Sequence, residues 1–374
     1  MLSLKKNIQK IFKSLGYFVF RIIYGEIKGV LNPIEDSEIE IQIVKKTDKF
    51  SYSLYKIKNA RLYTDRIKDT AIIKNNKIIE GPSFQFRTMQ SEEVVNRDIK
   101  ENNIFKNGTP RIKKNIKGNV VSLLTGGGGN ENYWHWMFDV LPRISICEDK
   151  INLSDINFFL VPDNKKRFQR ESLEILQIPK EKQISSKKFR HISSSNLYVT
   201  SHPVVLSNNA TKDIHNIPEW ISLWLRKKFL ENNINSRKDL PKKIYLDRSD
   251  SKSKNKNLRS IINEDEVKNY LISKGFSAIK LTELSFIDQA LTFYNADIIV
   301  GLHGAGFANI IFCKPNTKIL ELKANPFDKV IKSLANNNKL SHDSISLKGE
   351  EIKNYNQYGH IKISIDQLDK RIKI

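Results

Sequence analysis

The order of apolar and polar positions divides the chain near residue 236. Before that point, segments in which apolar and polar residues alternate predict half-buried strands, and continuous apolar runs predict buried ones. Segments with apolar residues three and four positions apart predict helices. Strands with turns are expected within residues 38–62 and 70–86, and single strands at 119–124, 157–161 and 197–200. The expected helices cover residues 168–176 and 218–233.

From Lys243 onward, strands and helices alternate regularly. Strands are predicted at 243–249, 277–283, 297–304 and 318–323, and helices at 264–274, 286–295 and 306–313. This alternation is typical of a parallel sheet of the Rossmann type. The polar, proline-containing segment INSRKDLPKK (234–243) is the best linker. We therefore expect two α/β domains, 31–235 and 236–374, with a ligand in the cleft between them.

The first thirty residues form a separate, basic segment. Apolar residues recur at helical spacing from Leu4 to Ile22, with lysines on the opposite side. The longest unbroken apolar run, Tyr17 to Phe20, is too short to cross a bilayer. A signal peptide is not expected, because the lysines are not followed by a continuous apolar segment and a cleavage site. This amphipathic helix is expected either to lie on an anionic membrane surface or to pack its apolar face on the protein.

Net charge narrows the class of binding partner, and cysteine content narrows the type of compartment. The net charge of +22 favours acidic partners, but the basic residues are scattered and form no arginine-rich arm, so no nucleic acid is expected. The two cysteines, Cys147 and Cys313, are far apart, which excludes a disulfide framework and suits a reducing compartment. The chain has no DxD and no HExxH, and we predict neither a metal nor a cofactor.

One candidate site lies in DIIVGLHGAGFANIIF. An apolar strand runs into His303, Gly304, Ala305 and Gly306, and a helix follows. Small residues between a strand and a helix N-terminus are where open parallel sheets bind phosphates, because backbone N–H groups can approach the ligand. His303 can donate a hydrogen bond to a phosphate oxygen. The pattern therefore predicts a site for a nucleotide diphosphate.

Four further residues are expected at the same site. Asn309 follows in the first helical turn, and the carboxylate of Glu321, on the next strand, can accept hydrogen bonds from ribose hydroxyls. Arg248 follows an upstream strand and Arg259 lies eleven residues later, so both can neutralise phosphate. Glu283 and Gln289 are weaker candidates for the same site than Arg248 and His303.

A second candidate lies in GGGGNENYWHWMFDVLPRI (126–144). The four glycines lack the Lys-Ser/Thr of a phosphate-binding P-loop and are expected to form a turn. On a helix beginning near Asn132, the residues His135, Asp139 and Arg143 recur at i, i+4 and i+8 and form one polar stripe. Alternatively, His135 is a satisfied core histidine, and Asp139 and Arg143 form a helix salt bridge.

Both stretches resemble glycosyltransferase family 61. The resemblance is carried by NYWHWMFDVLPRI, KIYLDRSDSKSKNKNLRSIINEDEV, LTELSFIDQALTFYNADIIVGLHGAGFANIIF and KPNTKILEL, in the order of the family's motifs, between Gly118 and Leu322. The family includes plant xylosyl- and arabinofuranosyltransferases, animal enzymes that place N-acetylglucosamine on protein hydroxyls, and bacterial proteins labelled capsular-polysaccharide biosynthesis.

The resemblance implies a GT-B-like fold with two Rossmann-like domains, the acceptor on the first and the nucleotide sugar on the second. It also implies inversion at the anomeric carbon, no essential metal, and a uridine-diphosphate sugar as donor. Such a transfer needs a base for the acceptor hydroxyl. We favour His135 oriented by Asp139, with Asp139 itself as the alternative. The expected acceptor-side residues are Asn132, Trp134 and Arg143.

The expected function is transfer of a hexosyl or pentosyl group to a glycan or lipid-linked glycan in capsule or lipopolysaccharide synthesis. The expected place is the cytoplasm, peripheral at the inner face of a bacterial plasma membrane. The alternatives are a non-catalytic nucleotide-sugar- or glycan-binding protein of the same fold and a basic nucleic-acid-binding protein.

Overall fold

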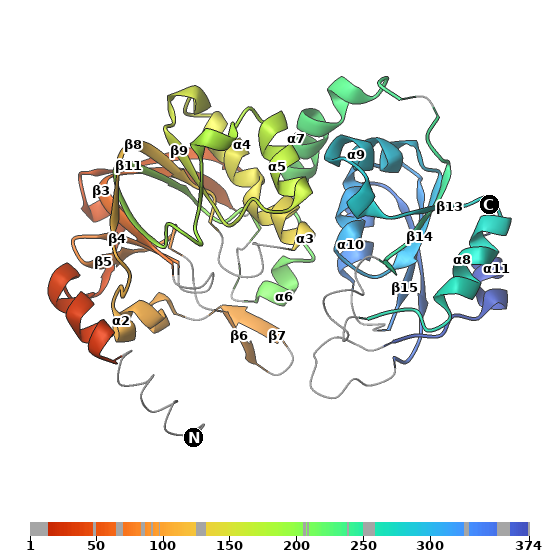
Figure 1. Ribbon diagram of the computed structural model, residues 1–374, viewed down its shortest axis with the longest axis horizontal. Coiled ribbons are helices and arrows are strands. Elements are labelled where there is room, and N and C mark those ends of the chain that lie inside the picture. The colour runs from red at the N-terminus through yellow and green to blue at the C-terminus, as the bar shows by residue number, and fades with distance from the viewer. Residues whose placement is uncertain are drawn as a thin grey trace. The chain divides into compact units, whose positions relative to one another are not determined.

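The computed structural model describes residues 14–47, 50–64, 70–83, 87–90, 93–96, 98–124, 132–204, 207, 209–237, 239–249, 259–324, 329–349 and 360–372. The chain divides into two compact units. The first comprises Met1–Gln169 and Gln177–Asp213, and the second comprises Arg170–Leu176 and Ile214–Ile374. Each unit contains a sheet with helices beside it (Figure 1).

The division of the chain differs from the expected boundary near residue 236. The longer segment of the second unit begins at Ile214 and includes helix α7 (Glu219–Phe229). Arg226 of α7 donates hydrogen bonds to the carbonyls of Ile311 and Cys313, at 2.6 and 2.8 Å. These bonds tie α7 to the end of a helix in the second unit, which explains why α7 belongs with that unit.

The first unit is built on a mixed nine-stranded sheet. Its strands are β1 (Val30–Leu31), β2 (Ile39–Lys46), β3 (Ser51–Tyr63), β4 (Ala71–Lys74), β5 (Lys77–Ile79), β8 (Lys114–Ser122), β9 (Phe158–Val161), β10 (Gln183–Ser185) and β11 (His191–Thr200). They run in the order β1-β5-β4-β3-β11-β8-β9-β10, and β2 pairs with β3. The pairs from β11 to β10 are parallel, whereas β3 is antiparallel to β2, β4 and β11.

The helices of this unit are short. They are residues 14–24, α2 (Asn103–Asn107), α3 (Tyr133–His135), the π-helix η4 (Trp136–Val140), α4 (Pro142–Glu148) and α6 (Ala210–Asp213). Helix α5 (Arg167–Ile175) crosses the division, because its residues from Arg170 onward belong to the second unit. A separate hairpin is formed by β6 (Arg87–Gln90) and β7 (Glu93–Asn96). Helix α4 packs against β3 and β11. The core contains the buried side chains of Ile57, Leu62, Val120, Leu160 and Ile192.

The second unit contains a five-stranded, fully parallel sheet. Its strands are β12 (Lys243–Leu246), β13 (Ser277–Ile279), β14 (Ile298–Leu302), β15 (Lys318–Lys323) and β16 (Ser341–Ser346), in the order β13-β12-β14-β15-β16. The connecting and flanking helices are α7, α8 (Glu264–Ser273), α9 (Phe286–Asn295), η10 (Ala305–Phe312), α10 (Val330–Asn337) and α11 (Ile365–Ile372). Counted along the chain, the order is 2-1-3-4-5, which is that of a doubly wound sheet.

The α/β class and the parallel sheets are confirmed. The facing of two domains across a cleft stays a prediction. Residues 305–312 differ from expectation in forming a 3₁₀-helix. The strands and turn expected within residues 70–86 are confirmed as a hairpin of β4 and β5. The hairpin turns at Asn75 and Asn76, whose φ angles of 51° and 57° suit a tight turn between antiparallel strands.

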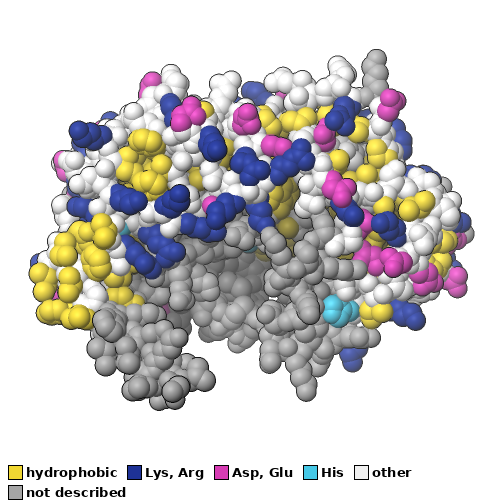
Figure 2. Space-filling view, viewed as in Figure 1, with side chains coloured by type: hydrophobic (Ala, Val, Ile, Leu, Met, Phe, Trp, Pro, Cys, Tyr) yellow, Lys and Arg dark blue, Asp and Glu magenta, His cyan; other side chains and the backbone are white. Residues whose placement is uncertain are grey.

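The helix of residues 14–24 has two different faces, and residues 1–13 lie outside the described part. One face packs on the first unit: the hydroxyl of Tyr24 accepts a hydrogen bond from the backbone N–H of Lys113 at 2.8 Å, and its ring contacts His191 edge-on. The other face exposes its apolar side chains (Figure 2). These are Leu15, Phe18, Val19, Ile22 and Ile23. The described residues contain no helix long and apolar enough to span a membrane.

Candidate functional site

Two strand ends bring Arg248 and His303 together in the second unit. β12 lies between β13 and β14, so the chain reverses its direction across the sheet at β12. In doubly wound sheets, ligands bind at the carboxyl ends of the strands at such a reversal. Arg248 follows β12 and His303 follows β14, and Nη1 of Arg248 donates a 2.7 Å hydrogen bond to the carbonyl of His303. The topology therefore places two of the predicted donor-binding residues at the expected point.

Gly304 makes the approach of Arg248 possible. Its φ of 166° is extended backbone that any residue can adopt, so conformation does not require glycine here. A Cβ at Gly304 would lie 2.7 Å from Nη1 of Arg248, which is closer than van der Waals contact allows. The glycine is needed because the guanidinium rests against the backbone.

The carboxylate of Glu321 contacts two imidazoles, those of His303 and His342. Its Oε1 is hydrogen-bonded to Nδ1 of His303, and its Oε2 lies 3.0 Å from Nε2 of His342. Nζ of Lys323 lies 3.5 Å from the same Oε2. Glu321 has no exposed surface, whereas 12% of the His303 side chain is exposed. The predicted contact of Glu321 with ribose is therefore replaced by a contact with His303, because burial keeps the carboxylate from a ligand.

These partners keep the carboxyl of Glu321 ionised although it is buried. Burial alone would raise the pKa of the carboxyl, since it disfavours the ionised form. The hydrogen bonds from His303 and His342 and the charges of His303 and Lys323 outweigh burial and lower the pKa of Glu321 to about 2. An ionised Glu321 holds the imidazole of His303 through Nδ1, which leaves Nε2 as the ring nitrogen for a ligand.

Asn309 is inside the second unit. It has no exposed surface, and its amide donates to Oε1 of Gln289 at 3.2 Å and to the carbonyl of Gly306 at 3.3 Å. Gln289 in turn donates to the carbonyl of Leu281 at 2.9 Å. This pair fixes the start of η10 against α9. Direct contact of Asn309 with a donor does not fit this burial, because η10 turns its side chain inward.

The other predicted donor residues lie as follows. Ala305 and Gly306 begin η10 and are half-buried, and a Cβ at Gly306 would lie 2.8 Å from Cδ1 of Leu281. Arg259 is half-buried and follows residues 250–258, which lie outside the described part. Glu283 ends the short helix η9 (Leu281–Glu283).

In the first unit, the predicted stripe begins at a capped helix. Oδ1 of Asn132 accepts a hydrogen bond from the backbone N–H of Trp134 at 2.9 Å and caps α3. One turn later, Nδ1 of His135 lies 2.5 Å from Oδ2 of Asp139. Both side chains keep some exposure, 20% for His135 and 16% for Asp139. The paired histidine and aspartate expected from their i,i+4 spacing are therefore present. The glycines 126–129 lie outside the described residues.

Pro142 explains the π-turn between these residues and α4. Proline has no N–H to bond to the carbonyl of Phe138. The helix widens instead, and the N–H of Leu141 bonds to the carbonyl of Trp136 at 3.0 Å, five residues earlier. Pro142 then opens α4. Single π-turns inside helices are frequent at functional sites.

Arg143 is buried, with 2% of its surface exposed. Its Nε donates to the backbone carbonyl of Asp139 at 3.0 Å, and Nη1 and Nη2 lie 3.1 and 3.0 Å from Oγ1 of Thr200 and Nδ1 of His202. Burial lowers the pKa of Arg143 to about 10, against the opposing effect of Asp139. Arg143 thus links α4 to the end of β11. Its predicted contact with an acceptor does not fit this position, because the side chain points into the unit.

Trp134 is also mostly buried, at 6% exposure, and its ring packs edge-on against Phe138 at 4.7 Å. This burial favours core packing of Trp134 over the expected contact with an acceptor. No group of three or more His, Cys, Asp or Glu that could hold a metal occurs in the part of the chain that the structure describes. Independence of a metal stays a prediction.

Sequence reasoning missed His342 and Lys323. His342 lies on β16, a strand that was not predicted, and nothing in the sequence pairs it with Glu321. Lys323 follows Glu321 by two residues on β15 and so lies on the same face. This spacing could have suggested a partner for Glu321.

Comparison with known proteins agrees with the geometry. Residues 133–320 match the sequence profile described as Glycosyltransferase 61, and this segment is about half of the chain. The chain belongs to the glycosyltransferase 61 family. The match contains the His135–Asp139 pair, Arg248 and His303, and it ends one residue before Glu321. The resemblance expected from the motifs is confirmed.

One similar protein is the EGF domain-specific O-linked N-acetylglucosamine transferase of Mus musculus. It is 33% identical to the chain over 69 residues, which cover 17% of the chain and 13% of that protein. The matched segment is therefore a small part of both proteins. It agrees with membership of the glycosyltransferase 61 family.

Proposed function

We propose that the chain is an inverting glycosyltransferase that transfers a sugar from a nucleotide sugar to a hydroxyl of a glycan or lipid-linked glycan. The observation that carries the proposal is the group of Arg248, Gly304 and His303 at the reversal point of a doubly wound parallel sheet, in a chain of the glycosyltransferase 61 family. A uridine-diphosphate sugar is the donor that the family resemblance favours.

In this proposal, the second unit holds the leaving group. Arg248 and Nε2 of His303 bind the diphosphate, whose negative charge grows as the bond between the anomeric carbon and the phosphate oxygen breaks. Glu321 and His342 keep His303 in place. Because Arg248 supplies a positive charge and His303 a hydrogen bond, a divalent metal is not required, and we propose that transfer continues in a chelator.

The first unit supplies the base. As the acceptor oxygen forms its bond to the anomeric carbon, its proton moves to Nε2 of His135, because Nδ1 is engaged by Asp139. Attack opposite the leaving diphosphate inverts the configuration. If His135 only orients the acceptor, Asp139 takes the proton instead.

The exposed apolar face of residues 14–24 supports a place at a membrane surface. Lys5, Lys6, Lys10 and Lys13 precede this helix in the sequence and suit anionic lipid headgroups. We propose peripheral attachment at the inner face of a bacterial plasma membrane, and a role in capsule or lipopolysaccharide synthesis. The alternative is a protein that binds nucleotide sugar or glycan without transferring it.

A screen of nucleotide sugars tests the proposal. We expect uridine diphosphate to raise the melting temperature, short duplex DNA to leave it unchanged, and one nucleotide sugar to be hydrolysed slowly in the presence of a chelator. Nucleotide binding without hydrolysis or transfer of any sugar would favour the binding protein. Stabilisation by DNA alone would overturn both.

A further inference from the structure

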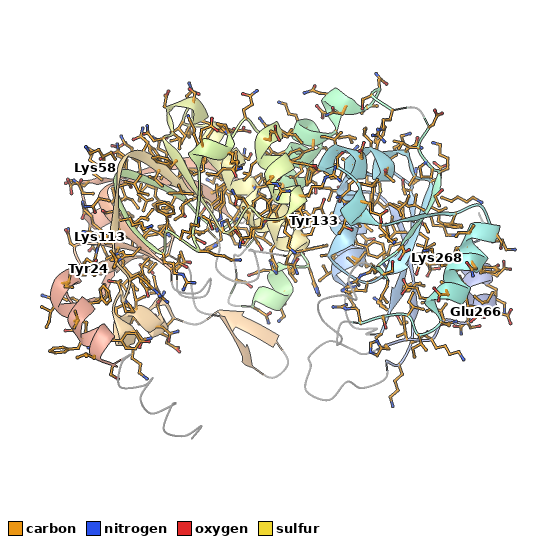
Figure 3. The ribbon with its side chains drawn as sticks, in the orientation of Figure 1. Tyr24, Lys58, Lys113, Tyr133, Glu266 and Lys268 are labelled. Carbon is orange, nitrogen blue, oxygen red and sulfur yellow. The ribbon has the colours of Figure 1, made fainter. Side chains whose placement is uncertain are left out.

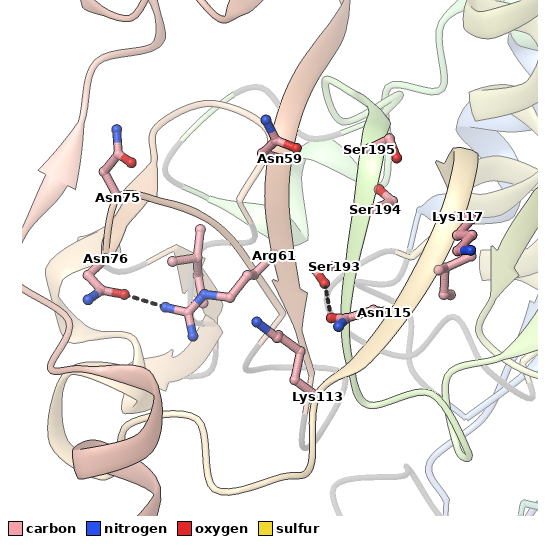
Figure 4. A pocket seen from close by; sticks show the side chains of 12 residues that line it. Asn59, Arg61, Asn75, Asn76, Lys113, Asn115, Lys117, Ser193, Ser194 and Ser195 are labelled. Carbon is pink, nitrogen blue, oxygen red and sulfur yellow. Dashed lines mark hydrogen bonds between the residues drawn. The ribbon is translucent and has the colours of Figure 1, made fainter.

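The first unit contains a groove of about 650 Å³ that the transfer chemistry does not use. It is lined by strands β3, β8 and β11 and by the β4–β5 turn (Figure 4). Its size is in the range of pockets for small molecules. We call it the β3–β8–β11 groove.

Strand register places polar side chains together on one face of the sheet. Arg61 of β3 pairs with Ser193 of β11, which pairs with Asn115 of β8. The adjacent residues, Leu62 and Ile192, belong to the core on the opposite face, as alternation requires. Oγ of Ser193 donates a 2.6 Å hydrogen bond to Oδ1 of Asn115. The floor of the groove is therefore polar, whereas the opposite face of these strands belongs to the core.

The lining side chains carry positive charge with no opposite charge among them. Arg61, Lys113 and Lys117 are cationic, and none of the twelve lining residues is acidic. Arg61 and Lys113 reach toward the same part of the groove (Figure 4). Arg61 and Lys113 are both half-buried, and burial lowers the pKa of the Arg61 guanidinium. Two half-buried cations are stabilised by an anion between them.

Both cations are held in position. Arg61 donates a hydrogen bond to Oδ1 of Asn76, which lies in the β4–β5 turn. Nζ of Lys113 lies over the ring of Tyr24, 5.7 Å from its centre, and Figure 3 shows the two residues side by side. Since their side chains are already ordered, binding an anion costs less conformational entropy.

Amides and hydroxyls surround the cations. Four of the lining residues are asparagines and three are serines. Three of the asparagines have positive φ, 53° at Asn59, 51° at Asn75 and 57° at Asn76, which explains their type by turn and bulge geometry. Their side chains nevertheless present both donors and acceptors to the groove, as sugar hydroxyls require.

We propose that the β3–β8–β11 groove binds an anionic saccharide, with its carboxylate or phosphate between Arg61 and Lys113 and its hydroxyls on the asparagines. That the ligand is a saccharide rests on the proposed function. The groove then holds a charged sugar of the acceptor on the unit that carries His135.

Calorimetric titration of the full chain tests this binding. The probes are hyaluronan tetrasaccharide, which carries carboxylates, glucose 6-phosphate, neutral chitotetraose and inorganic phosphate. We expect one of the two acidic saccharides to bind at least about tenfold more tightly than chitotetraose and inorganic phosphate, and its identity distinguishes carboxylate from phosphate. Equal binding of inorganic phosphate, or no binding of either acidic saccharide, overturns the proposal.

Matched variants locate the site. Arg61→Gln and Lys113→Gln should each weaken the acidic saccharide about tenfold, whereas Lys150→Gln, an equal charge change at an exposed lysine outside the groove, should not. Asn76→Gly keeps the turn conformation and removes only the amide, so it should weaken the saccharide by a smaller factor. Unchanged binding in both charge variants overturns the assignment, and Lys113→Gln decides it if Arg61→Gln does not fold.

Donor hydrolysis, measured on the same proteins, separates this inference from the proposed function. Arg61→Gln should hydrolyse nucleotide sugar at the wild-type rate, since it lies in the other unit from Arg248. Saccharide binding without hydrolysis in any protein would keep the groove and overturn the transferase. Hydrolysis without saccharide binding would keep the transferase and overturn the saccharide site in the groove.

Discussion

The buried carboxylate of Glu321 holds His303 by accepting a hydrogen bond from Nδ1 of the imidazole. The partly exposed histidine therefore owes its orientation to a residue that has no exposed surface. The second imidazole, that of His342, keeps the carboxylate in place from the other side at 3.0 Å. A buried charge of this kind affects both the stability of the second unit and the binding of a diphosphate.

The first prediction concerns stability at low pH. The pKa of Glu321 is about 2 in the folded chain and about 4.5 when unperturbed. A lowered pKa stabilises the fold above the unfolded value, and this contribution is lost as pH falls from about 4.5 toward 2. Its full size is on the order of 3 kcal/mol. We expect the free energy of unfolding, measured in urea, to fall through this range in the wild type.

Glu321→Gln tests this assignment. The variant keeps the shape of the side chain but removes the charge, so its unfolding free energy should be lower at pH 7 and should depend less on pH below 4.5. Its affinity for uridine diphosphate should fall about tenfold, because His303 loses its charged partner. A variant with the pH dependence of the wild type would show that another carboxyl is responsible.

The second prediction concerns Gly304. Its alanine variant would place Cβ 2.7 Å from Nη1 of Arg248, and a flexible guanidinium can move away. We expect Gly304→Ala to weaken uridine-diphosphate binding about tenfold with little change in melting temperature. Gly301→Ala is the contrasting control, because its Cβ would lie 2.9 Å from Cβ of Leu246 in the core. That variant should lower the melting temperature. Normal nucleotide affinity in Gly304→Ala would show that Arg248 does not bind the donor.

Sequence reasoning located the strand ends of the second unit well, and the reason is physical. Alternation of apolar strands and helices from Lys243 determines a parallel sheet, and parallel strands bring their carboxyl ends to one edge. Arg248 and His303 were therefore found together although 55 residues separate them. The direction in which a side chain points within a helix was not found in this way. Asn309 and Arg143 lie inside because of contacts with Gln289 and Thr200, which are distant in sequence.

The third prediction concerns the base. If His135 takes the acceptor proton, His135→Ala should lower kcat by about 10²–10⁴-fold with the affinity for uridine diphosphate unchanged. Asp139→Asn should keep the hydrogen bond but remove the charge, and should lower kcat by a smaller factor. If Asp139 is the base, the two variants should reverse their order. Full activity in both would contradict the assignment of the base.

The role of this pair was open in the sequence for a reason that the structure makes clear. Spacing of four residues predicts contact between His135 and Asp139, and the contact is present at 2.5 Å. The same spacing left a salt bridge between Asp139 and Arg143 as an alternative, and in the structure Nε of Arg143 donates to the backbone carbonyl of Asp139. The π-turn caused by Pro142 changes the helical register between the two pairs, and periodicity alone does not reveal it.

The last prediction concerns the helix of residues 14–24. Phe18 and Ile22 are 63% and 70% exposed, so replacing both with serine should change stability little. Each side chain contributes about 1.5–3 kcal/mol when buried in an apolar environment, so the double variant should bind vesicles at least tenfold more weakly. Sedimentation with phosphatidylglycerol-containing vesicles measures this, and vesicles of phosphatidylcholine alone should bind less because they lack anionic lipid. Leu223→Ser, at a site on α7 that is 58% exposed, is the matched control and should bind normally. Equal binding of the double variant and the wild type would exclude this face from the membrane.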